Sequence, residues 1–217
     1  MPTRIPPVTL ALLIINITVF LLQRVLGDAL IAHFALWPWG PDQLAQASNG
    51  SVIAVGFRLW QLVTYAFLHG GYMHIFFNMF ALYMFGGTIE DTFGARNFTL
   101  YYFVCLVTAA LAQLLVVKYF THGFEPTLGA SGAIFGVLLA FGVLYPQVKL
   151  MLLFLPIPIP AWLFVIGYGA VELVLGVSGW QPDVAHFAHL GGMLGGFLMI
   201  QYWRGKFPIK PRRRLMR

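Results

Sequence analysis

The chain has 217 residues, of which 59% are hydrophobic and only 9% are charged, and its mean hydropathy is +0.80. This composition excludes an ordinary soluble domain and indicates an integral membrane protein. The net charge of +6 is explained by membrane topology and lipid-headgroup contacts, so no nucleic-acid partner is predicted.

Continuous apolar runs predict membrane-spanning α-helices, because about 17 to 20 residues of helix cross roughly 30 Å of hydrocarbon. Strands of a β-barrel would instead alternate apolar and polar positions over about ten residues. The sequence therefore predicts an all-α membrane protein with a bundle of six transmembrane helices. The predicted spans are about 8–26, 70–87, 98–117, 129–145, 150–170 and 186–203.

The segments outside these helices predict how the chain is oriented. Residues 1–7 are expected to be a short cytoplasmic N-terminus, 8–203 the six-helix domain and 204–217 a basic cytoplasmic tail. With the N-terminus inside, ten of the 13 Lys and Arg residues lie in inner segments, as cytoplasmic loops require. The connection 27–60 is rich in Trp, Phe and Leu, which predicts a loop half-sunk in the membrane interface.

Polar side chains inside the predicted helices are costly in lipid, and so tend to be functional or paired. His74 and Asn78 are spaced i, i+4 on one helical face, while His186 and His189 are spaced i, i+3. The second, fourth and sixth helices all enter the membrane from the outside. Ser131, at the start of the fourth, is therefore predicted to lie at a similar depth to His74, Asn78 and His189, in one outward-facing cavity.

Serine chemistry fits this arrangement. An imidazole can take the proton of Ser131 while its oxygen attacks a carbonyl, and His74, Asn78 and the Ser131 amide can hold the oxyanion. No Asp or Glu is expected to orient the base, because Glu172 lies far along the fifth predicted helix, so the pattern predicts a Ser–His dyad with His189 as a candidate base. Gly129 and Gly132 are expected to let this segment approach the sixth helix closely.

Each feature also has another interpretation. The Gly-x-Ser-Gly stretch is typical of helix packing, and the His-x-x-x-Asn pair is typical of interhelical hydrogen bonding. His186 and His189 alone are compatible with a metal pair or a proton relay. The chain has no His-Glu-x-x-His zinc motif, and its single cysteine, Cys105, excludes an intramolecular disulfide and a Cys-x-x-Cys site, so no metal or cofactor is predicted.

These motifs resemble, over nearly the whole chain and in the same order, those of the rhomboid intramembrane serine proteases. The matching stretches are "HGGYMHIFFNM", "GASGAIFG" and "AHLGGMLGG". The resemblance implies that Ser131 is the nucleophile, that His189 is the general base, and that His74, Asn78 and the Ser131 amide form the oxyanion hole. It gives supporting roles to His69, Trp60, Gly129, Gly132 and Phe135, and at most such a role to His186.

Two positions depart from the family pattern. The usual Trp-Arg pair of the first external loop is Trp60-Gln61 here, so an arginine-dependent anchor of that loop is in question. Phe135 stands where other members have a tyrosine, which keeps a ring to stack on His189 and loses the phenol hydroxyl. Neither change removes a reacting group, so an active enzyme is expected.

Three functions are compatible with the sequence. The first is a protease that cleaves peptide bonds in or next to transmembrane segments of membrane-protein substrates. The alternative is a rhomboid-like pseudoprotease that binds membrane proteins without cleaving them, against which the intact Ser131 and His189 argue. A small transporter or proton relay is disfavoured, because no inverted repeat is visible. The compact six-helix core favours a bacterial inner membrane.

Overall fold

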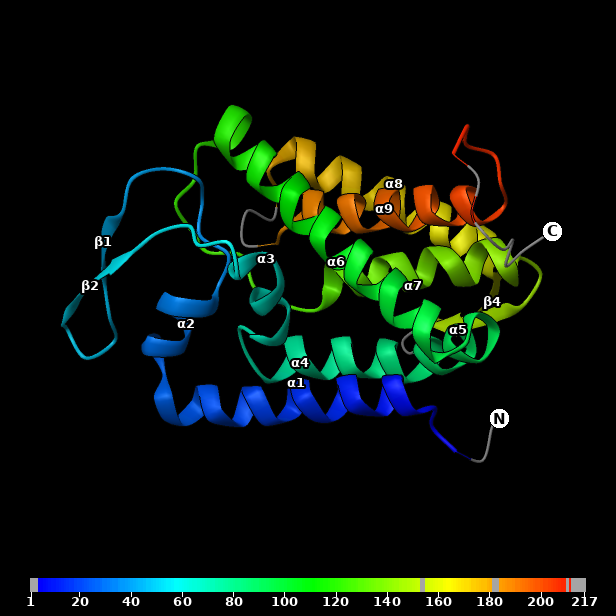
Figure 1. Cartoon of the computed structure of the whole chain (residues 1–217), viewed down its shortest axis with the longest axis horizontal. Coiled ribbons are helices and arrows are strands. Elements are labelled where there is room, and N and C mark those ends of the chain that lie inside the picture. The colour runs from blue at the N-terminus through cyan, green and yellow to red at the C-terminus, as the bar shows by residue number, and fades with distance from the viewer. Residues whose placement is uncertain (1–3, 153–154, 181–183, 210, 212–217) are drawn as a thin grey trace.

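The computed structural model describes residues 4–152, 155–180, 184–209 and 211, and these are mostly helical (Figure 1). The helices are α1 (Pro7–Leu26), α2 (Asp28–Phe34), α3 (Gln61–Thr64), α4 (Tyr72–Ala81), α5 (Gly87–Phe93), α6 (Ala95–Val116), α7 (Ser131–Leu144), α8 (Ala161–Ser178) and α9 (His186–Trp203). A 3-10 turn, η1 (Tyr65–Phe67), follows α3, and π-helical turns η2 (Leu82–Gly86) and η3 (Val117–Thr121) follow α4 and α6. Two antiparallel strand pairs complete the described chain: β1 (Gln43–Gln46) with β2 (Val52–Val55), and β3 (Lys149–Leu152) with β4 (Leu155–Pro160).

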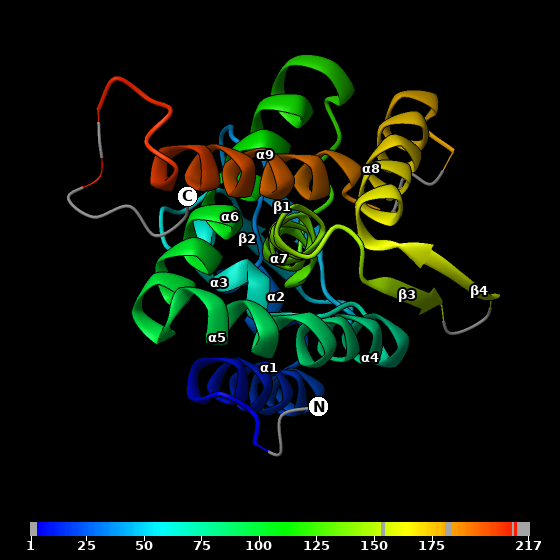
Figure 2. The same cartoon turned by 90° about the vertical axis from the view of Figure 1, so that its right-hand side faces the viewer.

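Helix α7 lies at the centre of the molecule. Figure 2 shows it end-on, with α9 above it, α8 beside it and α4 below, and with α1 beneath α4. Ten of the 14 residues of α7 are buried, whereas α8 buries only three of its 18, Ala161, Val165 and Glu172. The core therefore sits where α6, α7 and α9 meet, and α8 is an outer helix.

Small residues let α6, α7 and α9 pack this closely. A Cβ on Gly192 of α9 would collide with the carbonyl oxygen of Gly132 in α7. A Cβ on Gly136 would collide with the thiol of Cys105 in α6 and lie 3.1 Å from the Gly192 carbonyl oxygen. The predicted close approach of the fourth and sixth helices is confirmed, because only residues without a side chain fit at these contacts.

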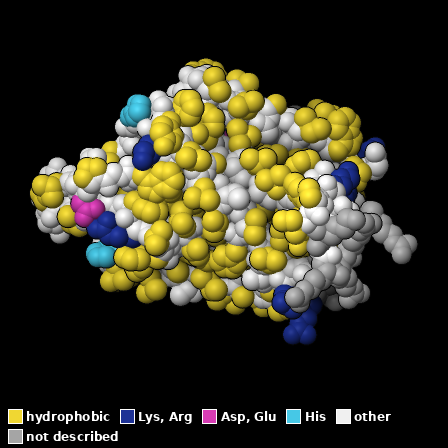
Figure 3. Space-filling model, turned by 45° about the horizontal axis from the view of Figure 1, so that its top comes forward, with side chains coloured by type: hydrophobic (Ala, Val, Ile, Leu, Met, Phe, Trp, Pro, Cys, Tyr) yellow, Lys and Arg dark blue, Asp and Glu magenta, His cyan; other side chains and the backbone are white. Residues whose placement is uncertain are grey.

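Among the described residues, three helical segments are long and apolar enough to cross a membrane, namely Pro7–Leu26, Ala95–Thr121 and Ala161–Ser178. Ser131–Leu144 is apolar but shorter. On the face drawn in Figure 3, hydrophobic side chains cover the middle of the molecule and the few charged ones gather toward its two ends. These features match a protein surrounded by lipid, while the predicted number of six spans stays a prediction.

The predicted fifth span, 150–170, is wrong at its start. Residues 149–152 and 155–160 form the β3–β4 pair, and helix α8 begins only at Ala161. The cause is the alternation of Pro156, Pro158 and Pro160, since a proline has no N–H for a helical hydrogen bond and is tolerated in edge strands. In the predicted basic tail, residues 210 and 212–217 lie outside the described part of the chain.

A buried carboxylate fastens the first helix to the rest of the molecule. Oxygens of Glu90 in α5 accept hydrogen bonds from the backbone N–H groups of Val8 and Thr9, at 2.9 and 2.7 Å, and from the Thr9 hydroxyl at 2.8 Å. Glu90 is only 2% exposed. The first N–H groups of a helix have no partner within it, so Glu90 caps α1 from a distant part of the chain.

Candidate functional site

Ser131 is the first residue of α7, and the loop before it is held by the backbone on two sides. Gly129 N–H donates to the Tyr65 carbonyl at 3.0 Å. Two residues earlier, Thr127 and Leu36 exchange a pair of backbone hydrogen bonds, each of 2.9 Å. The position of the serine at the end of a buried helix is thus determined by segments that are far apart in sequence.

His189 of α9 faces this serine. The Ser131 hydroxyl lies 2.7 Å from His189 Nε2, which is hydrogen-bonding distance. The ring of Phe135, one turn after Ser131, stacks on the imidazole with a centroid distance of 4.3 Å and an interplanar angle of 6°. The predicted stacking is confirmed, and it holds the ring plane of His189 while leaving Nε2 directed at the hydroxyl.

His74 and Asn78 line the same cavity, of about 790 Å³, as Ser131 and His189. His74 Nδ1 accepts a hydrogen bond from the Gly70 N–H at 3.3 Å, so the ring proton resides on Nε2 and is available to donate. Asn78 Nδ2 donates one hydrogen to the His74 carbonyl at 3.0 Å, and its second hydrogen has no partner among the residues that the structure describes. The structure therefore brings all four predicted residues to one cavity.

The glycines beside the serine have different neighbours. A Cβ on Gly129, whose φ is +118°, would lie 2.7 Å from His74 Nε2, so this glycine faces α4. The prediction that it faces the sixth helix is wrong. A Cβ on Gly132 would lie 2.5 Å from the Ala109 Cβ in α6 and 3.4 Å from the Ala188 carbonyl in α9. Gly132 thus has the expected packing role, and Gly129 instead leaves space for the His74 imidazole.

Glu172 contradicts the expectation that no carboxylate orients the base. Its Oε2 atom lies 2.8 Å from His189 Nδ1 and 2.7 Å from His186 Nδ1. All three side chains are buried. The prediction failed because α8 begins at Ala161 and runs in roughly the opposite direction to α9 (Figure 1), which sets Glu172 beside the first turn of α9.

His69 lies behind the cavity. Its ring packs edge-on to that of His74 with a centroid distance of 5.1 Å, and its two buried nitrogens have no hydrogen-bond partner among the described residues. Gln23 of α1 holds the His69 backbone, accepting from its N–H at 3.0 Å and donating to its carbonyl at 2.9 Å. His69 is therefore placed to support His74.

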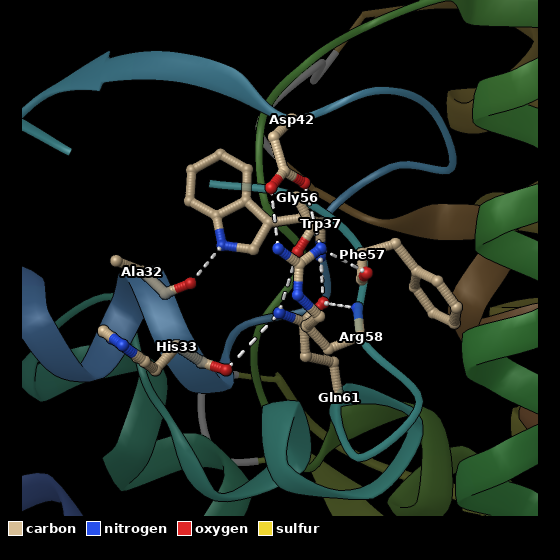
Figure 4. Close-up of polar contacts among 8 residues, drawn as sticks. All are labelled: Ala32, His33, Trp37, Asp42, Gly56, Phe57, Arg58 and Gln61. Carbon is tan, nitrogen blue, oxygen red and sulfur yellow. Dashed lines mark hydrogen bonds and ion pairs between the residues drawn. The ribbon is translucent and has the colours of Figure 1, made fainter. Parts of the chain in front are cut away.

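The loop between α2 and α3 is fastened by Gln61, as Figure 4 shows. Its buried amide accepts from the N–H groups of Trp37 and Arg58 at 3.3 and 3.1 Å and donates to the Gly56 carbonyl at 3.1 Å. Gln61 thus anchors this loop, although it stands where the family usually has an arginine. Trp60 is half exposed, and its indole N–H donates to the His33 carbonyl at 2.9 Å, so it contacts the loop and not the cavity.

Arg58 binds another part of the same loop. Its guanidinium donates to both carboxylate oxygens of Asp42, at 2.9 and 2.7 Å (Figure 4). This hydrogen bonding lowers the pKa of the Asp42 carboxyl. Both side chains are nearly half exposed, so water screens the pair and its contribution to stability is small.

Sequence reasoning missed the role of one site residue, Glu172. The available signal was a single carboxylate in an otherwise apolar helix, which is expensive unless it is paired. Spacing alone did not show that His186 and His189 would be its partners, because the pairing depends on how two helices align.

The sequence matches a known family and several known proteins. Residues 56–205 match the model of the Rhomboid domain. The chain is 30% identical over 197 residues to "Rhomboid protein 1, mitochondrial" of Saccharomyces cerevisiae, covering 79% of this chain and 56% of that protein. It is 32% identical over 154 residues to "Rhomboid protease GluP" of Bacillus subtilis, covering 70% and 27%. It is 31% identical over 211 residues to "Rhomboid protease GlpG" of Serratia proteamaculans, covering 91% and 62%.

The chain thus spans between about a quarter and three fifths of the length of these relatives. The domain match covers the cavity, both residues of the Ser131–His189 pair and the stretch that carries His74 and Asn78. Together with the apolar helices, it shows a multi-pass membrane protein. The chain belongs to the rhomboid family.

Proposed function

We propose that this protein is an intramembrane serine protease that hydrolyses peptide bonds in or next to transmembrane segments of membrane-protein substrates. Ser131 is the nucleophile and His189 the general base. The observation that carries the proposal is the 2.7 Å contact between the Ser131 hydroxyl and His189 Nε2, at a cavity that His74 and Asn78 also line. Two of the relatives named above are proteases by name.

The chemistry proceeds in two steps. The Ser131 oxygen attacks the substrate carbonyl carbon as its proton passes to His189 Nε2, and the negative oxygen is held by the His74 ring, the Asn78 amide and the Ser131 N–H. The imidazolium then gives that proton to the leaving amine. Water, activated by the same imidazole, hydrolyses the acyl ester and restores the hydroxyl.

The proposed architecture places this site below the membrane surface. We assign six spans to α1, α4 with α5, α6, α7, α8 and α9, with the N-terminus cytoplasmic in a bacterial inner membrane. Helix α7, at 14 residues, is about 21 Å long, which is shorter than roughly 30 Å of hydrocarbon. Ser131 at its end is therefore recessed, and a substrate helix must unwind there, because its carbonyls are otherwise hydrogen-bonded.

Serine-directed phosphonate labelling tests the proposal on purified protein in detergent. We expect labelling and cleavage of a transmembrane substrate in the wild type, and neither in folded Ser131→Ala or His189→Ala, since nucleophile and base act as one unit. Cleavage at the wild-type rate by folded Ser131→Ala would refute the assignment. Substrate binding without cleavage by the wild type would identify a pseudoprotease instead.

A further inference from the structure

We propose that Glu172 is a positioning residue for the base, so that Ser131, His189 and Glu172 act as a hydrogen-bonded triad in which His186 supports the carboxylate. This inference rests on the proposed protease function and deepens it. The sequence pattern and the family resemblance both implied a dyad without a carboxylate.

The geometry forms a continuous chain of hydrogen bonds. His189 Nε2 lies 2.7 Å from the Ser131 hydroxyl and its Nδ1 lies 2.8 Å from Glu172 Oε2. An ionised carboxylate only accepts, so Nδ1 must carry the ring proton, and Nε2 is then the unprotonated nitrogen that faces the serine. Glu172 thereby selects the tautomer that a general base requires.

His186 makes this arrangement stable. Its Nδ1 lies 2.7 Å from the same Oε2 atom, so two N–H donors converge on one carboxylate oxygen. Glu172 is the only carboxylate in α8 and one of just three buried side chains in that helix. Placing a charge in a membrane helix is expensive, and both donors face it from the first turn of α9. Packing alone would be served better by a leucine at this position.

The cluster also has a composition typical of metal sites, since one ligand atom each of Glu172, His186 and His189 lie within 4.8 Å of one another. The distances favour hydrogen bonding. Around a tetrahedral ion with bonds of about 2.0 to 2.2 Å, neighbouring ligand atoms stand roughly 3.3 Å apart or more. Here the carboxylate oxygen is 2.7 and 2.8 Å from the two nitrogens, which leaves no space for an ion between them.

The proposed role is electrostatic as well as geometric. When Ser131 attacks, its proton moves to Nε2, the Nδ1 proton stays in place, and the resulting imidazolium lies beside a carboxylate that remains ionised. The negative charge stabilises that imidazolium in a buried setting, where charges interact strongly. In soluble Ser-His-Asp enzymes, removing the charge of the carboxylate lowers turnover by about 10⁴-fold.

The test compares Glu172→Gln with Glu90→Gln in the full-length chain. Both replace a buried, hydrogen-bonded carboxylate by an amide of the same shape, but Glu90 contacts the start of α1 and not the base. For each variant, turnover of a transmembrane substrate is measured per folded molecule. Proton NMR records the low-field signal of an imidazole N–H bonded to a carboxylate, assigned to Nδ1 of His189 by its loss in His189→Ala.

We expect Glu172→Gln to lower turnover by about 10²- to 10⁴-fold and to shift the His189 signal upfield, while Glu90→Gln leaves both unchanged. We expect His186→Gln, which removes one of the two donors, to give a smaller loss. Wild-type turnover in folded Glu172→Gln would overturn the triad. So would a loss of turnover that only follows the loss of folded protein while the His189 NMR signal stays unshifted. Failure of the protease assignment is recognised separately, by cleavage in Ser131→Ala.

Discussion

Gly129→Ala is expected to disable the site by moving one side chain. The new Cβ would lie 2.7 Å from His74 Nε2 and 2.8 Å from its Cε1, whereas ordinary contacts begin at 3.4 Å. The imidazole must therefore retreat by about 0.7 Å, and a misplacement of about 1 Å in a positioned reaction costs on the order of 10²-fold in rate. We expect the rate per folded molecule to fall by about 10-fold to 10²-fold.

The same substitution also has a conformational cost. Gly129 has a φ of +118°, which residues with a side chain rarely adopt, and such strain is of order 1 to 3 kcal/mol. We expect a lower thermal midpoint in detergent as well as slower labelling. Both quantities are therefore measured on the same sample, and the rate is normalised to the folded fraction.

A double-mutant cycle separates the two effects. If Gly129→Ala acts through His74, then adding it to His74→Ala should produce no further loss of phosphonate labelling per folded molecule. The matched control is Gly94→Ala, because Gly94 also has a positive φ, +76°, but its Cβ would meet nothing within 4 Å. Fully additive losses of Gly129→Ala and His74→Ala would refute the reasoning, as would labelling in Gly129→Ala that falls only with the folded fraction.

Three further predictions concern single side chains. Asn78→Ala removes one of several oxyanion donors and is expected to lower turnover of a transmembrane substrate by about 10²- to 10³-fold, with background-level turnover indicating a larger role. Phe135→Leu removes the ring stacked on His189, an interaction that contributes about 0.5 to 1.5 kcal/mol. We therefore expect phosphonate labelling to slow by about tenfold at most. Phe135→Tyr keeps a ring at this position and should be labelled at the wild-type rate. Glu90→Ala leaves the first N–H groups of α1 without their cap and should lower the thermal midpoint without changing the rate per folded molecule; an unchanged midpoint would contradict the capping role.

The sequence by itself determined the class of protein and most of the candidate site. Its apolar runs indicate membrane helices because only a long apolar segment is stable in hydrocarbon. Two local patterns in the sequence can be recognised without a fold: the spacing of His74 and Asn78, and the glycines around Ser131. The structure places Ser131, His189, His74 and Asn78 at one cavity.

Only the tertiary structure decided the partners of these residues. Glu172 contacts His189 because it lies beside the first turn of α9, and the alignment of two helices is not encoded in a local pattern. Gly129, in the loop before α7, faces His74 of α4, and this contact likewise forms only when the chain folds. Contacts between helices depend on their relative depth and rotation, and these are set by close packing of the whole molecule, which the linear spacing of residues does not contain.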